Sequence, residues 1–190
     1  MLHDLDSTLM QLLNQQLPAE LVKQITISFQ PPNNQFPPSG VSLPAVDFFL
    51  YDVRENLELR NLEPTFEQQP DGRVLNVPAP VRVNCSYLVT AWPRSGVPSP
   101  EQDEHRLLGE VMKVLFSFRE LPSEVLQGSM KTLRMPLRAS LPPSSNLQSL
   151  GEFWQALGGK PRAALNYTVT LAVDVWKPVD VGTPALDVRT

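Results

Sequence analysis

The sequence has little of what catalytic and metal sites are built from. Among its 190 residues there is one cysteine, Cys85, and there are two histidines, His3 and His105. A single cysteine forms no internal disulfide, so we expect the chain to fold in a reducing cytoplasm. No cysteine and histidine stand at the spacing of zinc ligands, and we therefore expect no metal site.

Long apolar runs and an excess of basic residues are missing as well. No apolar run approaches the roughly eighteen residues that a membrane span needs, and the first six residues carry acids where a secretion signal carries basic residues. Sixteen basic residues against twenty acidic ones give a net charge of -4. Nucleic-acid binding draws its energy largely from Lys and Arg. We therefore expect a cytoplasmic protein that binds no nucleic acid.

Proline is what the sequence has in excess. Its 20 prolines are about twice the usual share, and five of them fall in residues 31–44. That segment lacks too many amide donors to be a helix or a central strand. A buried loop would leave backbone carbonyls without partners. We predict that residues 31–44 lie on the surface and contact neighbouring proteins instead of the core.

The spacing of apolar residues indicates the fold class. A helical period predicts helices over 2–17, 100–120 and 147–157. Alternation of apolar and polar residues, or an apolar run, predicts strands over 25–29, 45–55, 81–91 and 165–175, with a strand or loop over 133–141. The order favours a single α/β (α+β) domain at 1–178, whose mixed, partly antiparallel sheet packs against helices. An extended tail at 179–190 follows.

Three local patterns carry more detailed predictions. Residues 45–55 hold an apolar, aromatic run (Val46, Phe48, Phe49, Leu50, Tyr51 and Val53), which is consistent with a strand covered on both faces. Residues 99–102 read as a capping box with Pro100 at the first helical position. Residues 70–72 predict a turn, because proline presets φ and Gly72 accepts a positive φ. By the same reasoning the remainder of 61–80 reads as turns and loops.

No residue stands out as catalytic. Cys85 has the strand parity of apolar neighbours, so we expect an inert thiol in the core. His105 lies in the charged first turn of a helix, where solvation is expected. Asp103 and Glu104 point to different sides of that helix and form no acid/base pair. Residues 158–160 lack the strand and the hydroxyl residue of a phosphate loop, and Gly158 is better explained as a helix stop. We expect no catalytic, cofactor-binding or metal-binding residue and no cofactor.

The three tryptophans divide into two groups. Trp154 lies on the apolar stripe of its helix, which predicts a core residue. Trp92 and Trp176 each close a long strand. For those two, capping of the core and anchoring of an interface are both consistent with the sequence.

Six segments, in this order and spacing, also carry a family resemblance. They are Val46–Asn56, Leu59–Asn61, Arg82–Trp92, Glu104–Gly109, Phe153–Gly158 and Leu165–Thr170. Together they resemble the tail-terminator (cap) proteins of contractile injection systems, the phage-tail-like particles that drive an inner tube through a shortening sheath. The matching segments lie within residues 2–178, which make up most of the chain.

The resemblance implies a structural cap protein. Such a protein forms a ring of six subunits at the end of the particle distal to the baseplate, ends the polymerisation of tube and sheath, and joins sheath to tube. It implies other copies, sheath and inner-tube proteins as partners, assembly in the cytoplasm as part of a particle, and no cofactor or small-molecule substrate. The tail from Lys177 to Thr190 fits this role, because an extended segment can add a strand to another subunit or to the sheath. A frayed terminus is the alternative for the tail.

Two other functions remain open on the sequence alone. The first is a small cytoplasmic adaptor or binding module whose proline-rich loop at 31–44 is bound by a partner, although that loop lacks the flanking arginines of common proline-rich ligands. The second is an enzyme that uses scattered carboxylates. A ring, or copurification with sheath and tube proteins, distinguishes the cap from both.

Overall fold

The structure is a computed structural model that describes residues 1–33, 36–141 and 150–182. Its body is built on a five-stranded sheet with the strand order β1-β2-β5-β7-β6. These strands are β1 (Thr26–Ser28), β2 (Ala45–Glu55), β5 (Val81–Trp92), β7 (Ala164–Val173) and β6 (Arg138–Ser140). β1 is parallel to β2, and all other pairs are antiparallel. The mixed, partly antiparallel sheet predicted from the sequence is thus confirmed.

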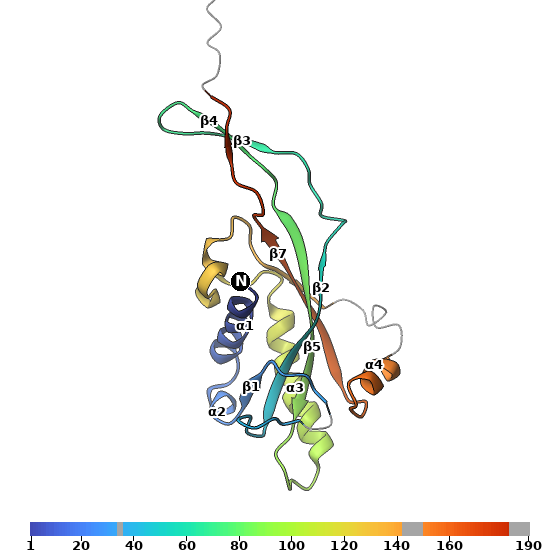
Figure 1. The fold of residues 1–190 in the computed structure, drawn as a ribbon. Helices are drawn as coiled ribbons and strands as arrows, with labels where there is room; N and C mark the ends of the chain where they lie inside the picture. Colours follow the sequence, from blue (N-terminus) through green and yellow to red (C-terminus); the bar gives the residue numbers. More distant parts are fainter. Residues whose placement is uncertain (34–35, 142–149, 183–190) are drawn as a thin grey trace, which may run out of the picture.

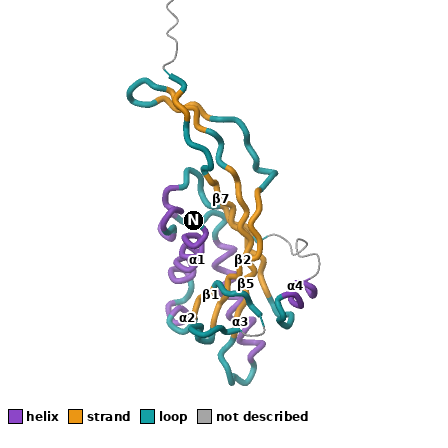
Figure 2. The backbone as a smooth tube through the Cα atoms, viewed as in Figure 1, coloured by secondary structure: helices purple, strands orange, loops and turns teal. Residues whose placement is uncertain are grey.

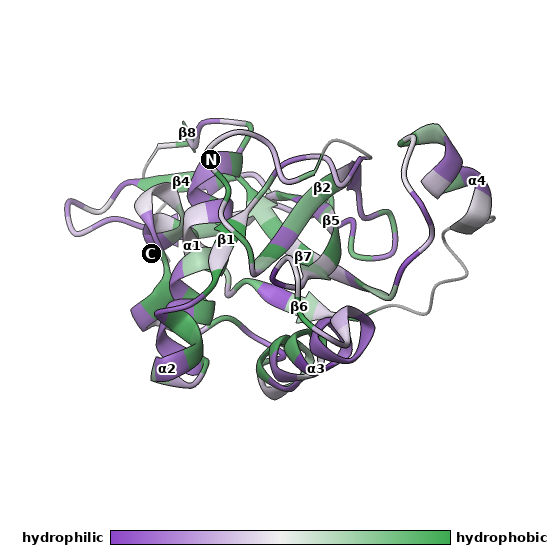
Figure 3. Cartoon of the chain, turned by 90° about the horizontal axis from the view of Figure 1, so that it is seen from below, coloured by the Kyte–Doolittle hydropathy of each residue, from purple (hydrophilic) through white to green (hydrophobic). Residues whose placement is uncertain are grey.

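Helices lie on both sides of this sheet (Figure 1). They are α1 (Leu2–Gln16), α2 (Ala19–Val22), α3 (Pro100–Ser117) and α4 (Leu150–Ala156), with short 3-10 helices η1 (Ser123–Val125) and η2 (Gly128–Thr132). In the view from below, α1, α2 and α3 lie on one side and α4 lies apart from them (Figure 3). The helices predicted over 2–17 and 100–120 are confirmed within a few residues, and so is the part of the helix predicted over 147–157 that is described, since residues 147–149 lie outside the described residues. The 3-10 helices were not foreseen.

The core lies between the sheet and the layer formed by α1 and α3. Each strand contributes alternate residues, because successive side chains point to opposite faces. The core residues from strands and helices are almost completely buried. They include Leu5, Leu9, Leu12, Leu13, Val46, Phe48, Cys85, Tyr87, Val111, Leu115, Tyr167 and Val169. The predicted place of Cys85 in the core is confirmed.

Two helix ends test the capping predictions. Pro100 begins α3 as expected, but the Ser99 side chain makes no capping hydrogen bond, so that part of the capping box is wrong. At the end of α4, Gly158 has a φ of 66. Its N–H donates to the Gln155 carbonyl at 2.9 Å, and the next N–H donates to the Trp154 carbonyl at 3.0 Å. This is the paired hydrogen bonding of a Schellman motif, which confirms the helix stop.

A second, smaller sheet was missed by the sequence analysis. Residues 61–80, predicted to be turns, contain β3 (Thr65–Gln68) and β4 (Val74–Val77), which pair as a hairpin around the predicted turn at 70–72. β8 (Val179–Asp180) pairs antiparallel with β4. The predicted tail thus begins by adding a strand to its own chain. Residues 183–190 lie outside the described residues, and the division of the chain at residue 178 stays a prediction.

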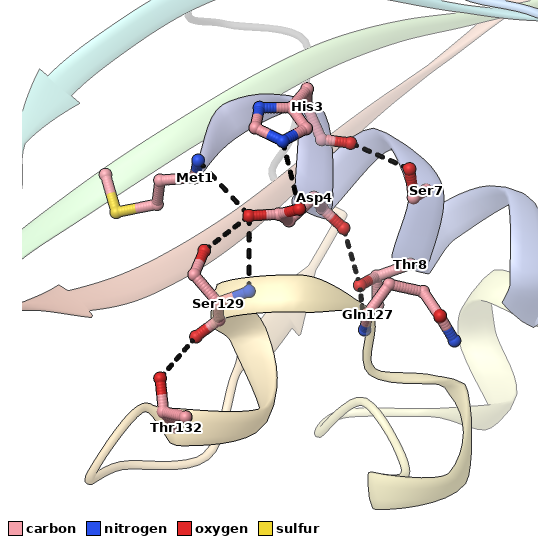
Figure 4. Close-up of polar contacts among 8 residues, drawn as sticks. All are labelled: Met1, His3, Asp4, Ser7, Thr8, Gln127, Ser129 and Thr132. Atoms are coloured by element: carbon pink, nitrogen blue, oxygen red, sulfur yellow. Dashed lines mark hydrogen bonds and ion pairs between the residues drawn. The ribbon is translucent and has the colours of Figure 1, made fainter.

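The first turn of α1 is fastened to η2 by Asp4 (Figure 4). The N–H and hydroxyl of Ser129 donate to the Asp4 carboxylate at 3.2 and 2.6 Å. One turn later, the Thr8 hydroxyl donates to the Asp4 carbonyl at 2.7 Å and accepts from the Gln127 N–H at 3.0 Å. Gly128, with a φ of 49, leaves room for this carboxylate, which a Cβ would strike. The hydrogen bonds from Ser129 lower the pKa of Asp4 to about 2.

An Asp4→Ala substitution is expected to destabilise the fold in a pH-dependent way. The pKa of Asp4 is depressed from 3.8, so its contribution to stability is present above about pH 4 and is lost as the pH falls towards 2. Urea unfolding at pH 7 and near pH 2 measures the difference between wild type and variant. We expect a clear loss at pH 7 that shrinks at low pH. Asp103→Ala, at a partly exposed acid on α3, is the control, and an equal loss at both pH values would contradict the assignment.

Candidate assembly interface

The most unusual feature of the molecule is a projection that we call the arm, residues 56–80 and 174–182. Figures 1 and 2 show the strands β2, β5 and β7 running beyond the helices and leading into the small sheet β3-β4-β8, which stands away from the body. The first half of β2 is buried, but its last three residues are exposed, so the prediction of a strand covered on both faces holds only for that half. The base of the arm is closed by a hydrogen bond of 2.7 Å from the Asn56 N–H to the Arg82 carbonyl.

The two faces of the small sheet differ in character. Phe66 is paired with Asn76, and Asn76 with Val179, so Phe66 and Val179 share a face. By alternation Val74 and Val181 lie on that face as well. The side chains of Phe66, Val179 and Val181 are 65%, 60% and 51% exposed. We call the face that carries these four residues the outward face of the arm; Asn76 and Gln68 lie on it as well.

The opposite face of the small sheet is held to the body. It carries Glu67 and the buried Val77. Arg134, from the segment after η2, donates to both carboxylate oxygens of Asp174 at 2.5 and 3.3 Å and to the Pro78 carbonyl at 3.3 Å. Its guanidinium also lies 3.9 Å from the Glu67 carboxylate. One side chain of the body therefore contacts three separate segments of the arm.

Exposed apolar side chains gather in the arm. More than half of the large hydrophobic residues exposed in the described residues belong to it: Leu57, Leu59, Leu62, Phe66, Val175, Trp176, Val179 and Val181. A three-stranded sheet needs an apolar face packed against something for stability, and large exposed apolar patches mark interaction sites. The arm therefore has the character of an interface. Trp176, which is 57% exposed, belongs to it.

A second apolar surface lies on the body beside the C-terminal end of α3. Here a hollow of about 650 Å³ is lined by Leu115, Phe116, Phe118, Arg119, Glu120, Arg138, Ala139, Ser140, Leu141 and Thr170. We call it the α3 groove. Phe116 at its rim is 61% exposed. The groove borders β6, the edge strand of the main sheet.

The proline-rich loop is only partly a surface feature. Phe36 is 8% exposed and stacks on Trp92 with ring centroids 4.2 Å apart. The Arg162 guanidinium lies 3.7 Å from the Trp92 ring and is paired with Glu104 at 2.5 Å. The loop at 31–44 is thus anchored to the body through Phe36, and the prediction that it avoids the core is wrong at that residue. Trp92 serves this anchor.

The residues considered as candidates for catalysis or metal binding do not form a common site in the described part of the chain. Burial raises the pKa of the Cys85 thiol to about 11, which suits an inert core residue. His105 is exposed on α3. Asp103 pairs with Arg106 at 3.1 Å, while Glu104 points to Arg162. In the described ranges no group of three potential ligands is placed to hold a metal ion. Nor is any helix there long and apolar enough to cross a membrane.

Trp154 and Asp47 are both buried. Trp154 is 1% exposed, which confirms its predicted burial. Asp47, which the sequence analysis overlooked, is fully buried on β2. Its Oδ1 accepts from the Gln30 N–H at 3.1 Å, whereas Oδ2 has no partner. Burial raises the pKa of Asp47 to about 7. The available signal was an acid inside the apolar run at 45–50.

Comparison with known proteins agrees with an assembly surface. The family model described as Pvc16 N-terminal domain matches residues 4–185. Among solved structures, the sheath/tube terminator of an extracellular contractile injection system (PVC), in the extended state, is similar with a TM-score of 0.71 and 30% identity. The tube-terminating cap of the anti-feeding prophage (AFP) is similar with a TM-score of 0.67 and 27% identity. All of this chain is covered in both cases, but it spans only 62% and 61% of those chains. No curated protein matches the sequence.

Proposed function

Because the chain belongs to the Pvc16 N-terminal domain family, we propose that it is a structural cap subunit of a contractile injection system. It ends the growth of tube and sheath at the end of the particle distal to the baseplate and joins the last sheath ring to the tube. The chain works through contacts with other proteins and not through catalysis. Its solved structural neighbours are a sheath/tube terminator and a tube-terminating cap.

The observation that carries the proposal is the arm. A soluble domain gains nothing in stability from a remote sheet whose outward face is left to water. Phe66, Val179 and Val181 are more than half exposed on that face. The same residues are favourable when a partner covers them, since each buried apolar side chain contributes about 1.5–3 kcal/mol. An assembly subunit accounts for this arrangement.

The finer features of the role belong to the same proposal. The subunits form a closed ring of six, their partners are sheath and inner-tube proteins, and assembly takes place in the cytoplasm as part of the particle. The adaptor alternative loses support, because the proline-rich loop that it needs is anchored through Phe36 and Trp92. The absence of a convergent set around Cys85 and His105 in the described residues supports a role without catalysis.

Labelling particles tests the proposal directly. The chain, carrying a small epitope tag, is coproduced with the sheath and tube proteins of its own system, and gold-labelled antibody is located by electron microscopy. We expect label at one end only, and tubes of variable length when the chain is omitted. Label along the whole particle, or particles of normal length without the chain, would overturn the assignment.

A further inference from the structure

Two apolar surfaces of this chain are unlike each other and do not meet within the chain. One is the outward face of the arm, with Phe66, Val74, Val179 and Val181. The other is the α3 groove, which no residue of the arm lines. The arm stands away from the body (Figures 1 and 2), and Arg134 of the body contacts it through Asp174. Each surface is therefore left for another molecule to cover.

The charges around the two surfaces are opposite in sign. The arm contains six acidic residues (Glu58, Glu63, Glu67, Asp71, Asp174 and Asp180) and three basic ones (Arg60, Arg73 and Lys177). It thus holds three of the four net negative charges of the chain. The α3 groove is lined by Arg119 and by Arg138, which is paired with Glu120 at 3.4 Å, so its net positive charge comes from Arg119. Complementary potentials of this kind select partners and speed their encounter.

We propose that the occupant of the α3 groove is the arm of a second copy of this chain. Phe66 and its neighbours on the outward face pack against Phe116 and the apolar lining of the groove, and the net negative charge of the arm is attracted by Arg119 at the groove. This inference rests on the proposed function and names the contact that would hold cap subunits together. A contact between unlike surfaces is directional, and its repetition gives a closed ring when the rotation between neighbouring copies closes.

The experiment uses the full chain in solution and one variant for each surface. Phe66→Ser with Val179→Ser impairs the arm, and Phe116→Ser impairs the groove. All three side chains are more than half exposed, so both variants are expected to fold. Sedimentation velocity over a concentration series should show self-association of the wild type, weakened at least about tenfold in each variant. Met10→Ser, at an exposed apolar residue on α1, is the matched control and should associate like the wild type.

Mixing the two variants gives the sharpest result. Each retains the surface that the other lacks, so an equimolar mixture should form a one-to-one pair and nothing larger. Added salt should weaken that pair, and so should Arg119→Glu in the partner whose groove is intact, because opposite charges attract across the contact. A mixture that stays monomeric would show that the arm and the groove are not complementary.

Other outcomes also decide the question. A wild type that is monomeric up to about 1 mM overturns the inference, as does equal weakening by Met10→Ser. An arm variant that self-associates normally but no longer binds sheath or tube would assign the arm to those partners; the inference would fail while the proposed function stood. If the chain self-associates as described but never labels a particle end, the inference would stand and the proposed function would fail.

Discussion

Removal of the arm is expected to abolish capping and leave the body folded. The last pair of β2 and β5 joins Glu55 to Val83, and Asn56 donates to the Arg82 carbonyl. An Asn-Gly turn in place of residues 57–81 therefore closes the two strands as a hairpin. Ending this variant after Trp176 removes β8, which has no partner once β4 is gone.

The expectation follows from how the core and the arm are divided. The core cluster draws on α1, α3 and the main sheet and contains no residue of β3, β4 or β8. Circular dichroism and thermal unfolding should therefore show a cooperative body with a melting temperature within several degrees of the wild type. Particle length in electron micrographs should become as variable as in the absence of the chain. Normal particle length with the arm removed would place the capping surface on the body. Loss of folding would contradict the expectation that the core is independent of the arm.

Asp47→Asn is expected to stabilise the protein at pH 8 by on the order of 3 kcal/mol. The Asp47 carboxyl is fully buried, and its pKa is raised from 3.8 to about 7. The folded state thus holds a proton that the unfolded state releases between about pH 4 and pH 7. Stability of the wild type falls as the pH rises through this window and levels off above it. Asparagine is neutral throughout and does not incur this loss.

Urea unfolding at pH 5, 6, 7 and 8 measures the effect. The difference between Asp47→Asn and wild type should be smallest at pH 5 and largest at pH 8. Asp6 is half-buried and its pKa is also raised, but it is present in both proteins and cancels in the difference. Asp103→Asn, on the exposed side of α3, is the control and should keep the wild-type pH dependence. A difference that is the same at all four pH values would show that Asp47 does not titrate in this range.

The features that were predicted correctly are those with a local period. The helices α1 and α3 each carry one apolar stripe, and the strands β5 and β7 alternate apolar with polar residues, so a period of 3.6 or 2 is visible without knowing the partner. The burial of Cys85 followed from the same alternation. The strand β2 was recognised from its apolar run. The turn at 70–72 was also visible, because it depends only on the dihedral preferences of its own residues.

Only the tertiary structure decided the rest. β3, β4 and β8 are short and bury little, so no apolar period marks them, and β8 pairs with residues about a hundred positions earlier in the chain. Phe36 looked like part of an open loop until Trp92 and Arg162 were placed beside it. Asp47 differs from an exposed acid only in what covers it. The sequence by itself thus determined the helices and strands of the body, since the order of apolar and polar residues within each segment predicts which side chains are buried. The arm, the anchored loop and the buried acid depend on contacts between segments that are distant in the sequence. A local sequence pattern does not specify such contacts.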